Sequence, residues 1–350
     1  MHLRILILFL LIMGASPKGI SSTQRGRDNL ILLPNCRQDR IDPNRDPFIL
    51  FIDQANTEIL MASYKLQEKK LPQKDMLDAL DRAVKRGVEV HVVTGNRLTS
   101  MEIVEDGKKV EKNAALNAYK ERGVKVYSSS EKFNQSHTKY IVVDGKKAII
   151  GTTNFDKELE GHTSNERPSR DFAVKIESEE IISELIQAFW NDINGEEFIG
   201  SQRDLLWGPN NQREIFKTLI ESAKRSIKIY QQDITDSEMI EWFMKAAKNH
   251  VDVKLIMSPH PFGFNNPDNN IDNQKKLADA GGNVYLINDL NIHAKVMILD
   301  DCLMYLGSTN FYQPSIDKNR TVGLLTSDAD LIQAVNAVFV EDWMKAAEKK

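Results

Sequence analysis

The sequence has few cysteines, no excess of charge of one sign and no hydrophobic run of membrane-spanning length. Only Cys36 and Cys302 occur among its 350 residues, which excludes a disulfide-rich scaffold and a four-cysteine metal site and leaves open either one bridge or two free thiols. Lys and Arg total 46 against 50 Asp and Glu, for a formal net charge of −4. This balance excludes a strongly cationic nucleic-acid binder. With 41% hydrophobic and 27% charged residues, the composition is that of a globular protein of about two domains.

The longest apolar run lies at the N-terminus. It extends from Ile5 to Met13, after the basic Arg4 and before small residues between positions 14 and 22. This order is typical of a secretory signal peptide. The run has about half of the roughly 20 apolar residues that a spanning helix needs, which favours export over anchoring. We therefore expect residues 1–21 to be a signal peptide and the mature protein to be secreted or periplasmic.

An internal repeat is the most informative feature. Two segments follow the pattern His-x-Lys-x4-Asp-x6-Gly-(Ser/Thr)-x-Asn. Two matches to six positions in one chain are far beyond chance at average residue usage. The first copy has His137, Lys139, Asp144, Gly151, Thr152 and Asn154, and the second has His293, Lys295, Asp300, Gly307, Ser308 and Asn310.

The repeat extends beyond these motifs. Alternating helical and strand-like segments precede each copy, and each half ends in a helical pattern, at 181–193 and 331–346. Strands that alternate with helices predict an α/β fold. We expect one domain at 22–200 and a second at 201–350, joined by a connector at 195–209 that is rich in Gly, Asn and Pro.

The spacing within the motif favours phosphate chemistry. Alternation along a strand places the His and the Lys of each copy on one face. Lys, Asn and Ser/Thr side chains supply hydrogen-bond donors that suit phosphate oxygens. Asp144 and Asp300 follow the apolar strands, where a carboxylate in a turn favours a structural role. As members of the motif they are also counted among the candidate catalytic residues.

These motifs resemble the paired HKD motifs of the phospholipase D superfamily, in an exported bacterial type, over essentially the whole chain after residue 21. The resemblance implies two similar α/β domains, each a mixed sheet flanked by helices, in a pseudo-twofold pair with one shared active site. It also implies a phosphohistidine intermediate and no metal. Carried over by position, His137 and His293 are the nucleophile and the general acid/base. The remaining candidates are the phosphate ligands Lys139, Asn154, Lys295 and Asn310, the supporting Thr152 and Ser308, and the catalytic Asp144 and Asp300.

The segments downstream of the motifs differ between the halves. The first half has Asp171 before an apolar strand, whereas the second has Thr321 at the matching place. A carboxylate on the inner nitrogen of an imidazole fixes its tautomer and stabilises its cation. We therefore predict that Asp171 supports His137 as the nucleophile, and that His293, facing Thr321, is the general acid.

Neither a metal nor a cofactor is expected, because no Cys/His cluster has ligand spacing. His162, between the first motif and Asp171, is a candidate substrate contact. The polar segment 260–272 is either a lid, an interfacial contact or an ordinary surface loop.

Three functions remain in order of preference. The first is an exported phospholipase D that hydrolyses glycerophospholipids to phosphatidate at a membrane or micelle surface, with possible transfer to an alcohol. The second is an exported nuclease of the same superfamily, which is disfavoured because neither half is basic. The third is a catalytically silent binding module. We expect a monomer.

Overall fold

The computed structural model describes residues 29–33, 47–66, 74–95, 103–105, 108–110, 114–155, 167–201, 203–210, 212–263 and 266–347. Its first half forms a mixed sheet in the order β1-β9-β8-β7-β2-β3-β6. The strands of this half, with a separate β4-β5 hairpin, are β1 (Leu30–Leu33), β2 (Glu58–Ser63), β3 (Glu89–Thr94), β4 (Ile103–Glu105), β5 (Lys108–Val110), β6 (Lys125–Ser128), β7 (Lys139–Val143), β8 (Lys147–Gly151) and β9 (Ser169–Ile176). Its helices are α2 (Pro47–Asp53), α3 (Lys74–Lys85), α5 (Ala114–Glu121) and α6 (Glu179–Asn194).

The second half repeats this topology, in the order β10-β17-β16-β15-β11-β12-β13. Its strands are β10 (Leu205–Gly208), β11 (Ser226–Tyr230), β12 (Asp252–Met257), β13 (Asn283–Leu286), β14 (Asn291–Ile292), β15 (Val296–Leu299), β16 (Leu303–Gly307) and β17 (Thr321–Thr326). Its helices are α7 (Gln212–Ser222), α8 (Ser237–Lys248), α9 (Ile271–Asp279), α10 (Gln313–Asp317) and α11 (Ala329–Ala347). The predicted α/β fold with two similar domains is confirmed. The expected connector at 195–209 is partly wrong, because its last residues form β10, an edge strand paired with β17.

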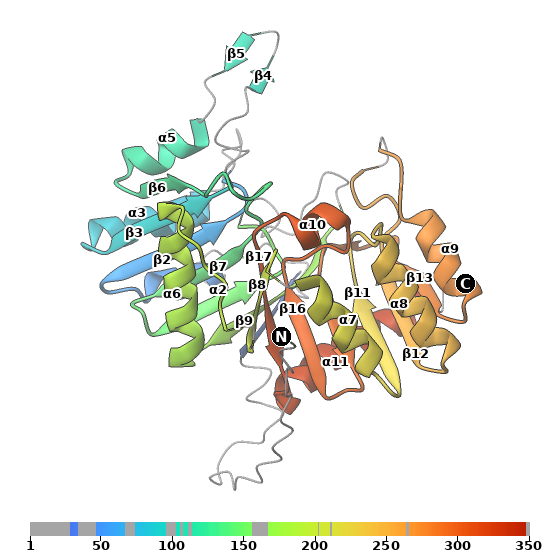
Figure 1. Ribbon diagram of the computed structural model, residues 1–350. Helices are drawn as coiled ribbons and strands as arrows, with labels where there is room; N and C mark the ends of the chain where they lie inside the picture. The colour runs from blue at the N-terminus through green and yellow to red at the C-terminus, as the bar shows by residue number, and fades with distance from the viewer. Residues whose placement is uncertain are drawn as a thin grey trace, which may run out of the picture.

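The two halves share a hydrophobic core. Figure 1 shows the sheets side by side, with β8, β9, β16 and β17 meeting at the centre. The buried side chains of the inner core come from both sheets and from the helices α6 and α11, for example Leu185 and Phe172 of the first half and Val322 and Phe339 of the second. Two outer cores lie beneath α2, α3 and α5 in one half and beneath α7, α8 and α9 in the other. Because the inner core takes apolar side chains from both halves, burial fixes their relative position.

The termini of α6 show why a helix forms there. The Ser178 side chain accepts a hydrogen bond from the N–H of Ile181, and Glu179 and Glu180 occupy the first turn. A hydroxyl cap and early carboxylates satisfy the exposed N–H groups and favour the positive end of the helix. Gly195, with φ of 70°, ends the helix in the left-handed conformation that glycine adopts without strain.

Candidate active site

Each motif histidine is held by the last strand of the opposite half. Strand β14 of the second half pairs in parallel with β9 of the first, and the N–H of His293 donates to the carbonyl oxygen of Arg170 at 3.2 Å. On the other side, Ser136 forms a parallel bridge with Arg320, and the N–H of His137 donates to the Arg320 carbonyl at 2.7 Å. Both histidines are therefore placed at the interface between the halves.

The side chain of His137 is buried, and its inner nitrogen faces the second motif. Nδ1 lies 2.8 Å from the carbonyl oxygen of Ser308. Because a carbonyl only accepts, Nδ1 carries the hydrogen, and the neutral ring keeps a lone pair on Nε2. Burial, together with the positive charges of Lys139 and Lys295, holds the pKa of His137 well below its usual range. His137 is therefore a neutral imidazole at physiological pH.

His293 differs because a carboxylate lies behind it. Its Nδ1 is 2.9 Å and 3.1 Å from the two oxygens of the fully buried Asp171. Asp171 also accepts from the hydroxyls of Thr152 at 2.5 Å and Ser169 at 2.8 Å. Burial alone would raise the pKa of Asp171, but the charge of His293 and these hydrogen bonds outweigh it and lower that pKa. Asp171 is therefore ionised and stabilises positive charge on the His293 ring.

This arrangement corrects the predicted partner of Asp171. The sequence predicts that Asp171 supports His137, whereas it binds His293 of the opposite half. Thr321 does not contact His293; its hydroxyl lies 3.2 Å and 3.3 Å from the side-chain nitrogen and oxygen of Gln212. The physical reason is that β9, which carries Asp171, pairs with the strand that leads into His293. The prediction that assigned the histidine roles from an Asp171–His137 contact therefore had a wrong premise.

The two motif lysines lie against this pair of histidines. Both are fully buried, and each ammonium donates to the carbonyl oxygen of the motif histidine two residues earlier. Nζ of Lys139 is also 5.3 Å from the ring centroid of Tyr64, and Nζ of Lys295 is 3.5 Å from Oε1 of Gln232. Because the charges of both lysines act on His137, the site concentrates positive charge where an anionic substrate would lie.

The hairpin that follows each motif strand returns the asparagine to the same end of the sheet. Tyr140 of β7 pairs with Ile150 of β8, so residues 152–154 lie level with the start of β7. The second half has the equivalent pairing of β15 and β16. Asn154 and Asn310 are 3% and 6% exposed, and the side-chain oxygen of Asn310 has no hydrogen-bond partner within the described chain.

Thr152 and Ser308 occupy equivalent places. Each hydroxyl accepts from a main-chain N–H of the last strand of its own half at 3.0 Å. Thr152 then donates to Asp171, whereas Ser308 uses its carbonyl oxygen for His137. Each therefore supports a histidine, one through a carboxylate and the other through the main chain.

Asp144 and Asp300 lie at the other end of the motif strands. Since a strand rises about 3.3 Å per residue, Asp144 is roughly 16 Å from Lys139. Its carboxylate accepts from the main-chain N–H groups of residues 56–58, as Asp300 does from residues 224–226. Burial would raise the pKa of Asp144, but these hydrogen bonds lower it to about 2. The expectation that both aspartates are catalytic is wrong, because they anchor the beginnings of β2 and β11.

The segment 260–272 lies at the boundary between the halves. It is described except for residues 264 and 265, and α9 begins within it at residue 271. Arg167 of the first half donates to the carbonyl oxygens of Pro259 at 3.0 Å and His260 at 3.4 Å. Phe262 is 45% exposed. These contacts join the segment to the first half, and its role as a lid or interfacial contact stays a prediction.

Several other predictions lie outside the described residues, namely those on residues 1–21, Cys36 and His162. Cys302 is exposed, although its apolar neighbours in the sequence predict burial. Within the described ranges, no group of three or more His, Cys, Asp or Glu residues is arranged to hold a metal ion. The helices of those ranges include none with the length and hydropathy of a membrane span.

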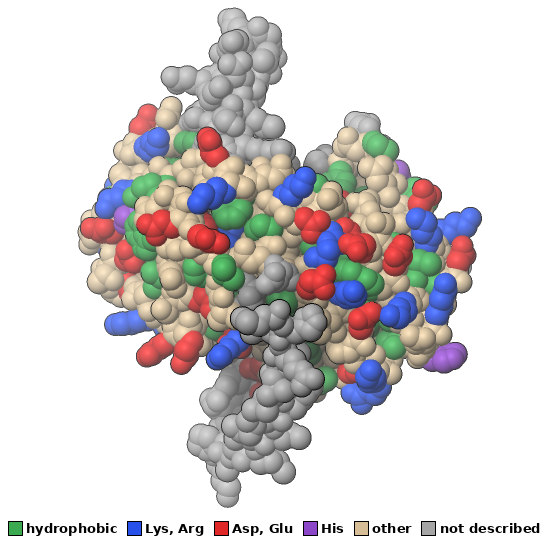
Figure 2. Space-filling model, viewed as in Figure 1, with side chains coloured by type: hydrophobic (Ala, Val, Ile, Leu, Met, Phe, Trp, Pro, Cys, Tyr) green, Lys and Arg blue, Asp and Glu red, His purple; other side chains and the backbone are tan. Residues whose placement is uncertain are grey.

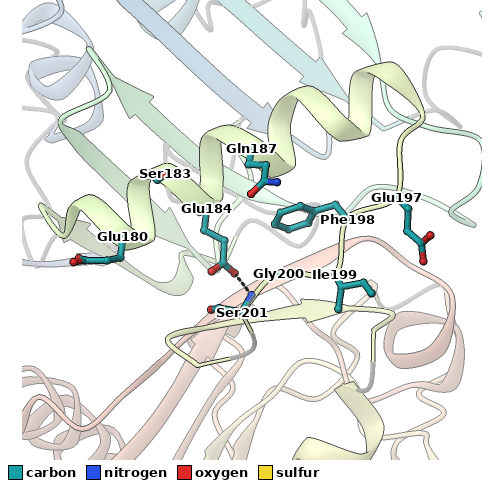
Figure 3. A pocket seen from close by; sticks show the side chains of 9 residues that line it. All are labelled: Glu180, Ser183, Glu184, Gln187, Glu197, Phe198, Ile199, Gly200 and Ser201. Carbon is teal, nitrogen blue, oxygen red and sulfur yellow. Dashed lines mark hydrogen bonds between the residues drawn. The ribbon is translucent and has the colours of Figure 1, made fainter.

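A hollow of about 640 Å³ lies away from the histidines, between α6 and residues 197–201 (Figure 3). Its lining includes Glu180, Glu184 and Glu197 and none of the motif residues. Glu184 accepts from the N–H of Ser201 at 3.1 Å and from the indole N–H of Trp207 at 2.8 Å. Carboxylates repel a phosphate, so this hollow does not suit the substrate that the motifs predict.

Two ion pairs that reach the site were missed by sequence reasoning. Arg170 pairs with Asp342, and Arg320 pairs with Asp192. The signal was present in the repeat, since an arginine precedes Asp171 and Thr321 alike and an aspartate lies three residues after Phe189 and Phe339. Without the fold, nothing connected these charges to the histidines.

Comparisons with known proteins agree with this geometry. "Probable cardiolipin synthase YwiE" of Bacillus subtilis is 25% identical over 296 residues, which cover 78% of this chain and 59% of that protein. Among solved structures, phosphatidylserine synthase of Haemophilus influenzae matches with a TM-score of 0.64 at 12% identity, over 93% of this chain and 90% of that one. Polyphosphate kinase of Porphyromonas gingivalis matches with a TM-score of 0.65 at 14% identity, over 90% of this chain and 47% of that one.

A family model described as "Cardiolipin synthase, PLD-like domain" matches residues 48–193 and 216–343, one segment in each half. The chain spans about half to three fifths of the length of the curated relatives that it matches. The two matched segments contain both motifs and both terminal helices. The chain therefore belongs to the PLD-like domain family of the phospholipase D superfamily.

Proposed function

We propose that this protein transfers a phosphatidyl group from one glycerophospholipid to a hydroxyl acceptor through a phosphohistidine intermediate. The observation that carries the proposal is the pair of buried histidines from opposite halves, one facing a carbonyl oxygen and the other a carboxylate. An alcohol is the preferred acceptor, and water gives phosphatidate as the hydrolytic product. The relatives named as cardiolipin synthases support an alcohol acceptor.

His137 is the proposed nucleophile. An attacking imidazole must be neutral, and the lowered pKa of His137 keeps it so. Its Nδ1–H is held by the Ser308 carbonyl, which leaves the Nε2 lone pair for phosphorus. In the first step a bond forms between Nε2 and phosphorus, and the bond from phosphorus to the head-group oxygen breaks.

His293 is the proposed general acid and base. The leaving alkoxide takes a proton from His293, whose protonated form is stabilised by Asp171. In the second step the now neutral His293 takes the proton of the acceptor hydroxyl. The acceptor oxygen bonds to phosphorus, the bond from phosphorus to His137 breaks, and both histidines return to their starting states. This keeps the roles that the sequence predicts but rests on a different reason, the neutrality of His137.

The lysines and asparagines complete the proposed site. Lys139 and Lys295 neutralise the phosphate oxygens, whose charge is shared as bonds to phosphorus form and break. The buried side chains of Asn154 and Asn310 lie at the same end of the strands and add uncharged polar contacts. Ammonium groups fixed in a buried site stabilise such charge more strongly than they would in water.

A phospholipid fits the surface better than a nucleic acid does. Figure 2 shows Lys and Arg side chains interspersed with Asp and Glu over both halves of the visible face. Polyanion binding needs a concentrated basic surface. Export of the mature protein, with residues 1–21 removed, is also part of the proposal and rests on the signal-like pattern of those residues.

The test is an assay of the purified protein on phosphatidylglycerol vesicles with EDTA present. We expect cardiolipin and glycerol as products, some phosphatidate, and phosphatidylethanol when ethanol is added. The His137→Asn variant is the control for contaminating activity. Parallel reactions contain single- and double-stranded DNA over a range of salt concentrations. Rapid, salt-resistant DNA cleavage without any lipid product would overturn the proposal in favour of a nuclease.

A further inference from the structure

Two arginines connect the last strand of each half to the last helix of the other. Arg170 of β9 donates from Nε and Nη2 to the two carboxylate oxygens of Asp342 in α11, at 2.8 Å and 2.9 Å. Arg320 of β17 donates from Nε to Asp192 in α6 at 2.9 Å. All four residues are buried. An ion pair in such surroundings is sensitive to the loss of either partner.

The main chain of each arginine holds a motif histidine of the other half. The carbonyl oxygen of Arg170 accepts from the N–H groups of His293 at 3.2 Å and Ala294 at 2.9 Å. Asp171 is the next residue in the chain and binds the ring of the same histidine. A shift of Arg170 therefore moves both the backbone support of His293 and the carboxylate behind it.

We propose that Arg170 and Arg320 are positioning residues, which fix the distance between the two histidines by clamping the terminal helices α11 and α6. This inference deepens the proposed function, because it assigns the groups that set the geometry of that site. Neither guanidinium contacts a histidine ring in the printed hydrogen bonds, so each acts through its own main-chain carbonyl.

The two clamps differ in construction. Asp342 binds the guanidinium at two points and also accepts from the hydroxyl of Tyr230 at 2.6 Å. Asp192 uses one oxygen, and its other oxygen has no partner among the described residues. The Arg320 guanidinium instead lies over the ring of Trp207, at 4.7 Å from the centroid, and near two phenylalanine rings. The clamp on His293 is therefore the more directional one, and it is the better target for a test.

The expected effect is on the chemical step. A displacement of about 1 Å at a reacting group costs on the order of 100-fold in rate. We expect Arg170→Lys, which loses the two-point contact, to lower kcat by about 10- to 100-fold. KM should change little, because the lysines and asparagines that face phosphate are unaltered. Tyr230→Phe removes only the hydroxyl that orients Asp342 and should lower kcat several-fold in a folded protein.

The matched control is Glu184→Ala. Glu184 also joins the halves, through the Trp207 indole, but does not contact Arg170 or Asp342. Its loss is expected to lower Tm and to leave kcat within about twofold of wild type, since a lost hydrogen bond costs about 1 kcal/mol. A purely structural role for Arg170 would give the same result as this control.

The deciding measurement is the proton resonance of His293 Nδ1–H in protein labelled with ¹⁵N-histidine. The signal is assigned by its absence in His293→Asn. We expect it to shift in Arg170→Lys and Tyr230→Phe and to stay unchanged in Glu184→Ala. An unchanged resonance in both folded variants, or a fall in kcat that only tracks Tm, would overturn the inference. Because the resonance reports geometry without turnover, it decides the matter even if no phosphatidyl transfer is found.

Discussion

Asp171 lies 2.9 Å from Nδ1 of His293, across the boundary between the two halves of the molecule. The same nitrogen of His137 faces an uncharged carbonyl oxygen. Two histidines in nearly symmetric places thus have different electrostatic surroundings. An imidazole beside a carboxylate holds a proton more readily than one beside a carbonyl, so the difference suits them to opposite roles in proton transfer.

Replacement of Asp171 by Asn is expected to lower kcat by about 100-fold or more, because a positioned proton-transfer group contributes roughly 10²- to 10⁴-fold. The pKa of Asp171 is lowered, so the carboxylate is charged above that pKa and its contribution is lost only as the pH falls through it. The loss in Asp171→Asn should therefore be constant across neutral pH. Steady-state kinetics from pH 5 to 8 measure it.

The control for this variant is Thr321→Ser, at the equivalent place in the second half. It keeps a hydroxyl for Gln212 and should retain kcat within about twofold. Equal losses in Asp171→Asn and Thr321→Ser would contradict a special role for the carboxylate.

Trapping of the intermediate should assign the histidines. His137→Asn should show no turnover and no label, because it lacks the nucleophile. His293→Asn should also fail on natural lipids, but with a phosphodiester that carries a good leaving group it should form the intermediate and then stall. Acid quench and peptide mapping are expected to find phosphorus on His137. Label on the peptide that contains His293, in wild-type protein, would reverse the assignment.

Asp144→Asn is expected to affect stability and not catalysis. The pKa of Asp144 is lowered to about 2, so its contribution is complete above the unfolded value of about 3.9 and disappears as the pH falls toward 2. Allowing for partial solvent screening, we expect a loss of about 1–2 kcal/mol at pH 7 and almost none near pH 2. Denaturant unfolding at several pH values measures this. A more than tenfold fall in kcat in the folded variant would return Asp144 to the catalytic set.

The motif glycines should respond unequally to Ala. A Cβ on Gly307 would lie 2.3 Å from the Cα of Gly323, whereas a Cβ on Gly151 would lie 3.2 Å from the Cβ of Ala173. Overpacking of this kind costs about 1–3 kcal/mol or more. We expect Gly307→Ala to lower Tm clearly and Gly151→Ala to have a smaller effect. Similar Tm values for both variants in thermal unfolding would show that β16 and β17 can separate.

Much of the fold was predictable from the repeat. A pattern of six residues that occurs twice, with helical and apolar segments in the same order before it, predicts two similar α/β domains, and the topologies are the same. Strand alternation likewise predicts that His137 and Lys139 share a face. These inferences depend on local periodicity, which the sequence displays directly.

The cross-connections were not predictable in this way. Asp171 is closer in sequence to His137 than to His293, and proximity along the chain suggested the wrong pair. The correct pair follows from the parallel pairing of β14 with β9, a contact between residues more than 100 positions apart. Asp144 was misjudged for a related reason, because membership of a motif does not distinguish a residue at the site from one that anchors the far end of its strand.

The crossing of the last strands has a consequence for how the two copies can diverge. In a dimer of identical chains, any change in the residue behind one histidine would appear behind the other as well. Here the two copies are joined in one polypeptide, and each supplies the surroundings of the other's imidazole. A carboxylate at position 171 and a hydroxyl at position 321 can therefore coexist, so that one ring is adjusted without altering its counterpart. Covalent fusion gives this molecule a polarity that a symmetric assembly could not sustain.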